Sequence, residues 1–239
     1  GNYAFYGCSK IPTVSLPNMV IEIGDHAFDS CINLKTLILG NSITTIGNSA
    51  FASCGNLIGQ GDTLIIRNNV ITIGNNAFNS CASIRKIQLG DSIKTIGTNA
   101  FYNCVKITNI SIPNSVEEIK IGAFSECSGL SSISFGNSLK LIDNYAFSST
   151  SITKVILPNG VRKIGEGAFA NCKKLSSISI PNTINYIGYN VVEGTSVKYN
   201  AFDNAYYLGN DENKYVALIK GKDKNISSCT INDNARVIS

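Results

Sequence analysis

The 239-residue sequence has no tryptophan, one histidine and few charged residues. Asp, Glu, Lys and Arg make up only 15 % of the chain and apolar residues 44 %, which excludes a disordered tail or a solvated coiled coil. The 20 basic residues exceed the 16 acidic ones by four and are spread along the chain, so no basic cluster predicts binding to nucleic acid. No apolar run is long enough to span a bilayer, and we expect no membrane insertion by this region.

The residues needed for common catalytic and metal sites are also scarce. His26 is the only imidazole, and it precedes Ala27 at a position that varies along the chain. No Ser or Cys nucleophile elsewhere in the chain can therefore have a histidine partner, and no carboxylate has a second acidic residue paired with it. The sequence has no C-x-x-C pair for zinc and no G-x-x-x-x-G-K-[ST] phosphate loop. We therefore expect a non-enzymatic protein with no catalytic residues, no metal site and no cofactor.

What the sequence does contain is an internal repeat. The dipeptide Ala-Phe recurs with its phenylalanine at Phe5, Phe28, Phe51, Phe78, Phe101, Phe124, Phe147 and Phe169. The gaps between copies are 23, 23, 27, 23, 23, 23 and 22 residues, and a degenerate copy with Val191-Val192 follows after a further 23. A unit of about 23 residues cannot bury its apolar side chains alone. The period therefore predicts a solenoid of stacked coils.

Each copy has the same internal order. A cysteine follows three residues after the phenylalanine, and then come apolar positions spaced L-x-x-I-x-L, a Pro or Gly, and an Asn. The alternation at Leu37-x-Leu39 predicts a short strand with one buried face, and we expect these strands to form one long parallel sheet. A second short extended piece, such as Ile43 to Ile46, runs to a glycine. Glycine at this place in most copies, for example Gly24 and Gly47, suggests a positive-φ corner. Lys120 and Asp143 occupy it in two copies, so a corner that merely tolerates glycine is the alternative to a strictly left-handed one.

Seven of the eight cysteines occupy one repeat position, from Cys8 to Cys172, and Thr150 replaces the missing member. Neighbouring coils would bring their α-carbons within disulfide reach, so distance does not exclude pairing. Because every thiol points the same way into the same ladder, we favour small buried thiols over a disulfide framework.

The repeat pattern A-F-x-x-C-x-x-L-x-x-I-x-L-P-N-S-V-x-x-I-G, in which Ile often replaces Leu, covers residues 1–196 and includes the copy from Phe101 to Phe124. It resembles the leucine-rich repeats of the BspA-like surface protein family. The resemblance implies a right-handed horseshoe or arc with little helix, secreted or displayed at a cell surface. It also implies an adhesin-type module that binds host proteins, such as matrix or mucosal glycoproteins, and that is anchored by parts outside this chain.

The pattern divides the chain into three parts. Residues 1–198 contain eight to nine stacked repeats, 199–225 form an inserted tyrosine-rich island, and 226–239 begin a further repeat. Within the island we expect a β-hairpin of 205–208 with 215–219 around the turn-forming residues 209–213. In the last part Ile226, Cys229, Ile231 and Ile238 match the apolar positions of a repeat. Because both ends fall inside repeats, we expect a fragment of a longer protein.

Two groups of residues are candidates for binding. The outward strand positions are mostly small hydroxyl and amide side chains, and the candidates among them are Thr36, Thr63, Lys86, Gln88, Asn109 and Ser111. The island supplies Tyr199, Tyr206, Tyr207 and Tyr215. Exposed Ser and Thr are also simply good strand formers, and the island is favoured slightly as a structural plug over a ligand platform.

Two other functions stay open beside the adhesin. The repeats could be a structural spacer that presents other domains, or an intracellular scaffold. The sequence names neither the ligand nor the oligomeric state.

Overall fold

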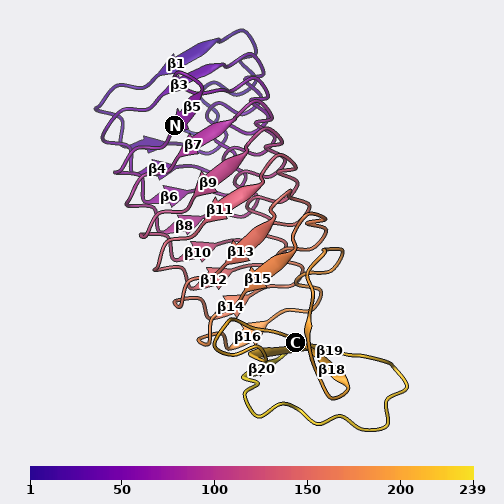
Figure 1. Cartoon of the computed structure of the whole chain (residues 1–239). Coiled ribbons are helices and arrows are strands. Elements are labelled where there is room, and N and C mark those ends of the chain that lie inside the picture. Colours follow the sequence, from indigo (N-terminus) through magenta and orange to yellow (C-terminus); the bar gives the residue numbers. More distant parts are fainter.

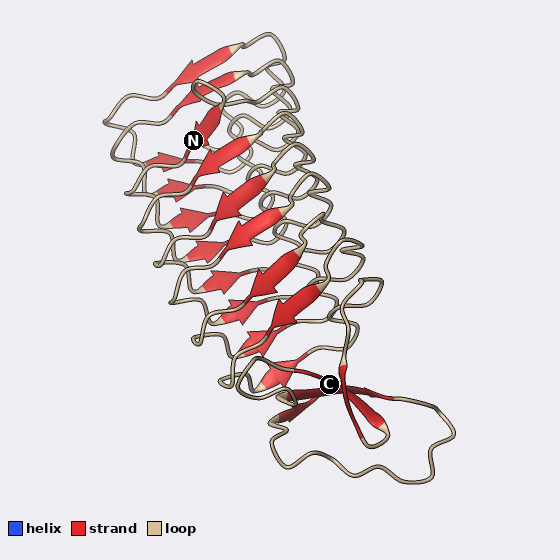
Figure 2. Ribbon diagram, viewed as in Figure 1, coloured by secondary structure: helices blue, strands red, loops and turns tan.

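The computed structural model describes all 239 residues as an elongated stack of coils built from short strands and turns, without any helix (Figures 1 and 2). Each coil carries one three-residue strand on one face of the stack and one two-residue strand on another face. The predicted class, a parallel repeat solenoid, is therefore confirmed. Because the structure contains no helix, it has no helical segment that could span a membrane.

The strands of the stack fall into two sets. The odd strands are β1 (Thr13–Ser15), β3 (Thr36–Ile38), β5 (Thr63–Ile65), β7 (Lys86–Gln88), β9 (Asn109–Ser111), β11 (Ser132–Ser134), β13 (Lys154–Ile156) and β15 (Ser177–Ser179). The even strands are β2 (Glu22–Ile23), β4 (Thr45–Ile46), β6 (Thr72–Ile73), β8 (Thr95–Ile96), β10 (Glu118–Ile119), β12 (Leu141–Ile142), β14 (Lys163–Ile164) and β16 (Tyr186–Ile187).

The continuous sheet is made by the even strands, not by the odd ones. All eight even strands pair in parallel as one sheet, in the order of the chain. The odd strands pair only two by two, as β1–β3, β5–β7, β9–β11 and β13–β15. The expected long parallel sheet of short strands is therefore present, but the even strands form it, and only its assignment to the L-x-L strands was wrong. The register follows the repeat in both sets, for example Thr95 opposite Glu118 and Lys86 opposite Thr63.

A third ladder of hydrogen bonds runs along the turn edge, where there are no strands. The backbone N–H of His26 donates to Asn48 O and that of Phe28 donates to Ala50 O, both at 2.8 Å. This pattern satisfies the peptide groups of the Ala-Phe turns between successive coils. It uses a left-handed residue directly before the alanine, or before Val191 in the last copy, found at Tyr3, His26, Ser49, Asn76, Asn99, Gly122, Tyr145, Gly167 and Asn190.

The prediction that Gly24 and Gly47 have positive φ was wrong, because the left-handed position lies two residues later. These glycines serve a close approach between coils instead. A Cβ on Gly47 would lie 2.7 Å from the carbonyl carbon of Gly24 in the preceding coil, a distance that side-chain carbons do not reach. Glycine is selected here because it has no side chain.

The core is a set of ladders of like residues. Consecutive phenylalanines from Phe5 to Phe169 stack with ring centroids 5.0 to 5.5 Å apart and planes within 8° of parallel. Beside them the buried thiols donate to the phenylalanine carbonyl one coil earlier, as from Cys104 Sγ to Phe78 O at 3.2 Å. All eight cysteines are free. Burial raises the pKa of the Cys127 thiol to about 12, so the buried thiols stay protonated.

The island folds onto the last coil as an end sheet. Here β17 (Asn200–Phe202) and β19 (Ala217–Gly221) pair antiparallel with β18 (Ala205–Leu208), and β20 (Val237–Ile238) runs parallel to β19. The hairpin pairs 205–208 with 217–221 rather than with 215–219. Leu208, Val216 and Ala217 belong to the same apolar core as the coils.

Residues 226–231 do not form the strand that the repeat pattern predicted for them. No strand is present there, and Cys229 and Ile231 are exposed. The chain from 222 to 231 runs as a loop away from the stack (Figure 1), so these apolar residues have no coil to pack against. Of the four apolar positions that the repeat pattern predicted after residue 225, only Ile238 lies in a strand. This strand is β20, which lies close to β16.

Candidate binding surfaces

The odd-strand face, defined as the outward side chains of β1 to β15, brings one group of candidate residues together. The middle residue of each odd strand points into the core and the two flanking residues point outward, as the burial patterns of the strands show. Lys86 and Gln88 on β7 and Asn109 and Ser111 on β9 are exposed. The other two candidates, Thr36 on β3 and Thr63 on β5, are half-buried. All six lie on four successive coils of one surface.

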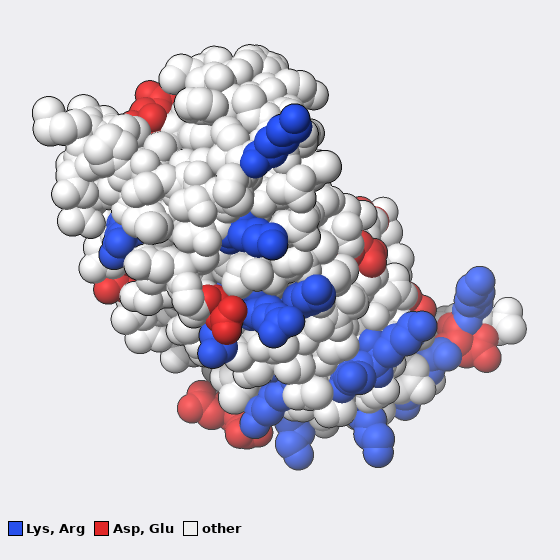
Figure 3. All heavy atoms as spheres, turned by 90° about the horizontal axis from the view of Figure 1, so that it is seen from above, with Lys and Arg blue, Asp and Glu red and all other residues white.

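This face is polar but weakly charged. Among the outward positions of the odd strands only Lys86 and Lys154 are charged. Figure 3, a view from above, shows most Lys and Arg side chains in the lower and right-hand parts of the picture and a wide uncharged area at the upper left. The outward positions of the odd strands include no aromatic residue. The face therefore offers many hydrogen-bonding groups, but it has few of the aromatic anchors that usually supply binding energy at protein interfaces.

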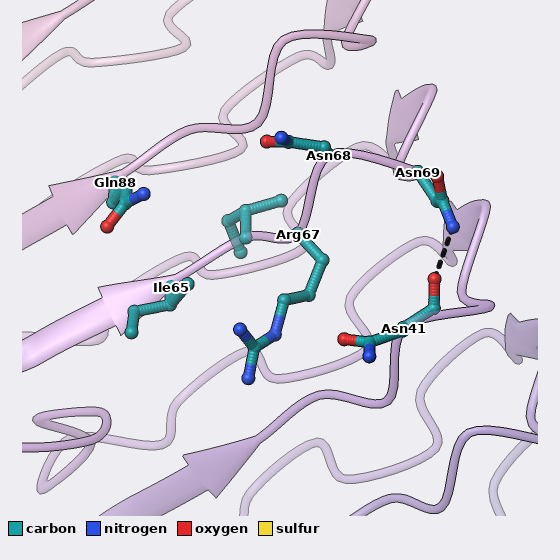
Figure 4. Close-up of a pocket in the computed structure, with 7 residues that line it drawn as sticks. Asn41, Ile65, Arg67, Asn68, Asn69 and Gln88 are labelled. Carbon is teal, nitrogen blue, oxygen red and sulfur yellow. Dashed lines mark hydrogen bonds between the residues drawn. The ribbon is translucent and has the colours of Figure 1, made fainter.

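A pocket of about 300 Å³ opens at the edge of this face, where β5 ends. It is lined by Asn41, Ile65, Ile66, Arg67, Asn68, Asn69 and Gln88 (Figure 4). Gln88 was among the predicted residues, whereas Arg67 was not. A signal was available, because Arg67 stands where the other coils have proline or glycine, two residues after the odd strand ends.

The four island tyrosines do not form one exposed platform. Tyr207 is fully buried and its hydroxyl accepts the Asn232 N–H at 3.2 Å, so its ring is not accessible to a ligand. Tyr215 is half-buried and packs edge-on against Tyr207, with ring centroids 5.5 Å apart. Tyr199 and Tyr206 are half-buried neighbours at 5.6 Å. Desolvation, followed by the charge of Glu193, raises the pKa of Tyr199.

The island tyrosines and the six strand residues lie on different parts of the molecule. The tyrosines lie on the end sheet beyond the last coil, and the six strand residues lie on coils nearer the N-terminus (Figure 1). The core positions of the island match the role of a structural plug, and they leave Tyr199 and Tyr206 as its more accessible rings.

A second group of tyrosines was missed by the sequence analysis. Tyr145, Tyr186 and Tyr189 are exposed near the C-terminal end of the stack. The Tyr145 hydroxyl donates to the Glu166 carboxylate, and this contact, with a second one from Tyr189, lowers the pKa of Glu166. Gly167 leaves room for the Tyr145 ring, since a Cβ there would lie 2.4 Å from Tyr145 Cε1.

The only histidine does not contact a nucleophile. His26 Nδ1 lies 2.9 Å from Asp29 Oδ2, and the Ser30 hydroxyl donates to Asp29 Oδ1, also at 2.9 Å. Asp29 thus lies between the other two side chains, whereas nucleophilic catalysis requires the imidazole to contact the hydroxyl directly. The Tyr3 ring stacks on the imidazole with centroids 4.7 Å apart.

Comparison with protein families identifies the repeat. A family model described as BspA type leucine-rich repeat region matches six copies, over residues 1–106, 58–153 and 94–211. These overlapping matches together span residues 1–211, which is most of the chain. No curated protein matches the chain.

Solved structures resemble the chain to different degrees. A leucine-rich repeat protein from Bacteroides ovatus is 32 % identical with a TM-score of 0.71, over 80 % of this chain and 49 % of that one. The chain thus spans about half the length of that protein. A leucine-rich repeat protein from T. pallidum is 28 % identical with a TM-score of 0.45, over 81 % of this chain and 67 % of that one. A leucine-rich cell surface protein from Faecalibacterium prausnitzii is 20 % identical with a TM-score of 0.33, over 83 % of this chain and 81 % of that one.

Proposed function

We propose that this chain, which belongs to the BspA-type leucine-rich repeat family, is a non-enzymatic, adhesin-type module that binds a protein ligand outside the cell. Leucine-rich repeat proteins generally serve as surface or protein-interaction modules, and the proposal assigns this chain to the adhesin-type members of that broad class. Host matrix proteins and mucosal glycoproteins are the proposed ligands.

The observation that carries the proposal is the rigid polar odd-strand face. The middle coils are fixed by strand pairing, the stacked phenylalanines and the turn-edge hydrogen bonds, so little backbone freedom is lost when a partner docks. Small outward residues such as Ser111 allow a partner backbone to approach closely. Lys86, Gln88 and Asn109 can then form hydrogen bonds to its peptide groups.

A structural spacer is the second candidate. The observation in its favour is the same stiffness, together with the lack of aromatic residues on the odd-strand face. A binding module and a structural spacer should respond differently to surface substitutions, because a spacer needs its core but not its outward side chains.

The test measures binding of the chain to a panel of purified extracellular-matrix proteins and mucins at physiological salt. One variant carries Asn109→Arg and Ser111→Arg, which place two long cations on β9. The matched control carries Thr72→Arg and Asn185→Arg, which add the same charge at exposed positions of the even-strand side. All four sites are exposed, so both variants should fold.

We expect saturable binding that the β9 variant weakens at least tenfold and the control leaves within about twofold. Equal loss in both variants would indicate a non-specific charge effect and would contradict the assignment of the face. Absence of saturable binding to the whole panel would favour the spacer. Loss caused only by substitution of Tyr199 and Tyr206 would move the site to the island.

A further inference from the structure

Arg67 differs from the other arginines in its surroundings. Arg85, Arg162 and Arg236 are exposed, whereas Arg67 is half-buried in the pocket after β5. Its Nε donates to Leu39 O at 3.2 Å. The terminal guanidinium nitrogens have no hydrogen-bond acceptor in the chain, and Arg67 takes part in no ion pair. These unpaired nitrogens are not buried away from solvent, so they can donate to an anion that enters the pocket.

The neighbouring coils have glycine at the position of Arg67. Gly40 and Gly90 occupy the equivalent positions one coil before and one coil after. A Cβ on Gly90 would lie 2.3 Å from the backbone oxygen of Arg67, so a side chain cannot be accommodated there. Gly40 and Gly90 have no side chain that could enter the space around the guanidinium, and Figure 4 shows the Arg67 side chain lying between Ile65 and Asn41.

The remaining lining residues suit a carboxylate. No acidic residue lines the pocket. Asn69 donates to Asn41 O, and Asn68 Oδ1 accepts the Asp91 N–H, so these two amides serve coil stacking. The side-chain amides of Asn41 and Gln88 have no partner in the chain and are free to donate. Guanidinium binds a planar carboxylate through two parallel hydrogen bonds, and such amides can add further donors.

We infer that this pocket receives the carboxylate of an Asp or Glu side chain from the protein partner that docks on the odd-strand face. The inference rests on the proposed function, and it adds a charged anchor to a face that otherwise has few. A protein carboxylate fits better than an acidic sugar, because no aromatic ring lines the pocket to stack on a sugar ring. Ile65 and Gln88 belong both to the pocket and to the face, so an extended acidic segment can contact the two together.

The experiment follows the Arg67 Nε–Hε signal by NMR in the full ¹⁵N-labelled chain. The probes are the blocked peptide acetyl-Gly-Gly-Glu-Gly-Gly-amide, its Gln counterpart, and the methyl glycoside of N-acetylneuraminic acid as an acidic sugar. We expect a saturable shift with the Glu peptide, and at least tenfold weaker binding of the Gln peptide and of the sugar. Tenfold corresponds to about 1.4 kcal/mol.

Two matched variants test the residue itself. Arg67→Gln should abolish the saturable shifts of neighbouring amides, whereas Arg85→Gln, with the same loss of charge, should retain them. Arg67→Gly restores the residue of the two adjacent coils and checks that the loss does not come from unfolding. Equal binding of the Glu and Gln peptides, tighter binding of the sugar, or unchanged binding by Arg67→Gln would each overturn the inference.

These results are separable from the test of the proposed function. If the β9 variant weakens partner binding but Arg67→Gln does not, the face stands and the pocket assignment fails. If the Glu peptide binds at Arg67 but no panel protein binds the chain, the carboxylate site stands and the adhesin proposal fails.

Discussion

Truncation of one ring in the middle of the phenylalanine ladder tests how the solenoid is stabilised. Phe101 is fully buried, and its centroid lies 5.3 Å from those of both Phe78 and Phe124. Replacing Phe101 with alanine removes a buried ring and leaves a cavity, which typically costs about 3–5 kcal/mol. Phe5 has one stacked neighbour and is 45 % exposed, so Phe5→Ala should cost about 2 kcal/mol.

The free energy of unfolding is measured by urea denaturation followed by far-UV circular dichroism. With an m-value of about 3 kcal/mol/M, a cost of 3 kcal/mol lowers the midpoint by about 1 M. Phe101→Leu serves as the control, because it keeps apolar volume but loses the stacking, and it should cost about 1–2 kcal/mol. A midpoint for Phe101→Ala no lower than that for Phe5→Ala would refute the reasoning that the ladder is a continuous core.

Three further predictions follow from the side-chain environments. In the native chain a thiol reagent should modify exposed Cys229 rapidly and half-buried Cys8 slowly, and the six buried thiols only after unfolding; fast reaction of more than two would contradict the buried ladder. Tyr207→Ala should cost about 3 kcal/mol and Tyr206→Ala less than about 1 kcal/mol by thermal unfolding, because only the first ring is fully buried; equal costs would mean that the island does not serve as a plug. A hydrogen bond and ion pair from Lys140 lower the pKa of Glu117 in the folded chain. The contribution of Glu117 to stability is therefore present above the ordinary pKa of 4.5 and is lost as the pH falls through the lowered value. The urea midpoints of the chain and of Glu117→Gln should therefore differ at pH 7 and converge near pH 2, and a difference that stays constant with pH would be inconsistent with this.

The repeated core could be predicted from sequence because each coil must place the same residue on the same rung. The regular spacing of phenylalanine and cysteine in the sequence therefore predicts that each residue type forms a ladder along the stack. The glycines show where this logic stops. Both a left-handed turn and a close backbone approach select glycine, so the sequence alone could not distinguish the two demands at Gly47. The structure places the left-handed turn at Ser49 instead.

The binding surfaces were harder to predict, because they depend on departures from the repeat. Tyr206 pairs with Lys220 and Tyr207 with Leu218, so the strand register shifts between the two tyrosines. At this irregularity the Tyr206 ring stays accessible and the Tyr207 ring is buried. Two consecutive tyrosines in a sequence do not reveal this difference. Arg67 could have been found from its unusual repeat position, but the pocket around it is lined by residues of three successive coils and is visible only in the folded chain.

The most direct test of the central claim is a hydrogen–deuterium exchange footprint of the chain with the panel protein that it binds most tightly. We predict slower amide exchange in peptides that contain β7, β9 and the Arg67 segment, and unchanged exchange in the even strands. Protection confined to residues 199–221 would contradict the claim that the odd-strand face is the binding surface.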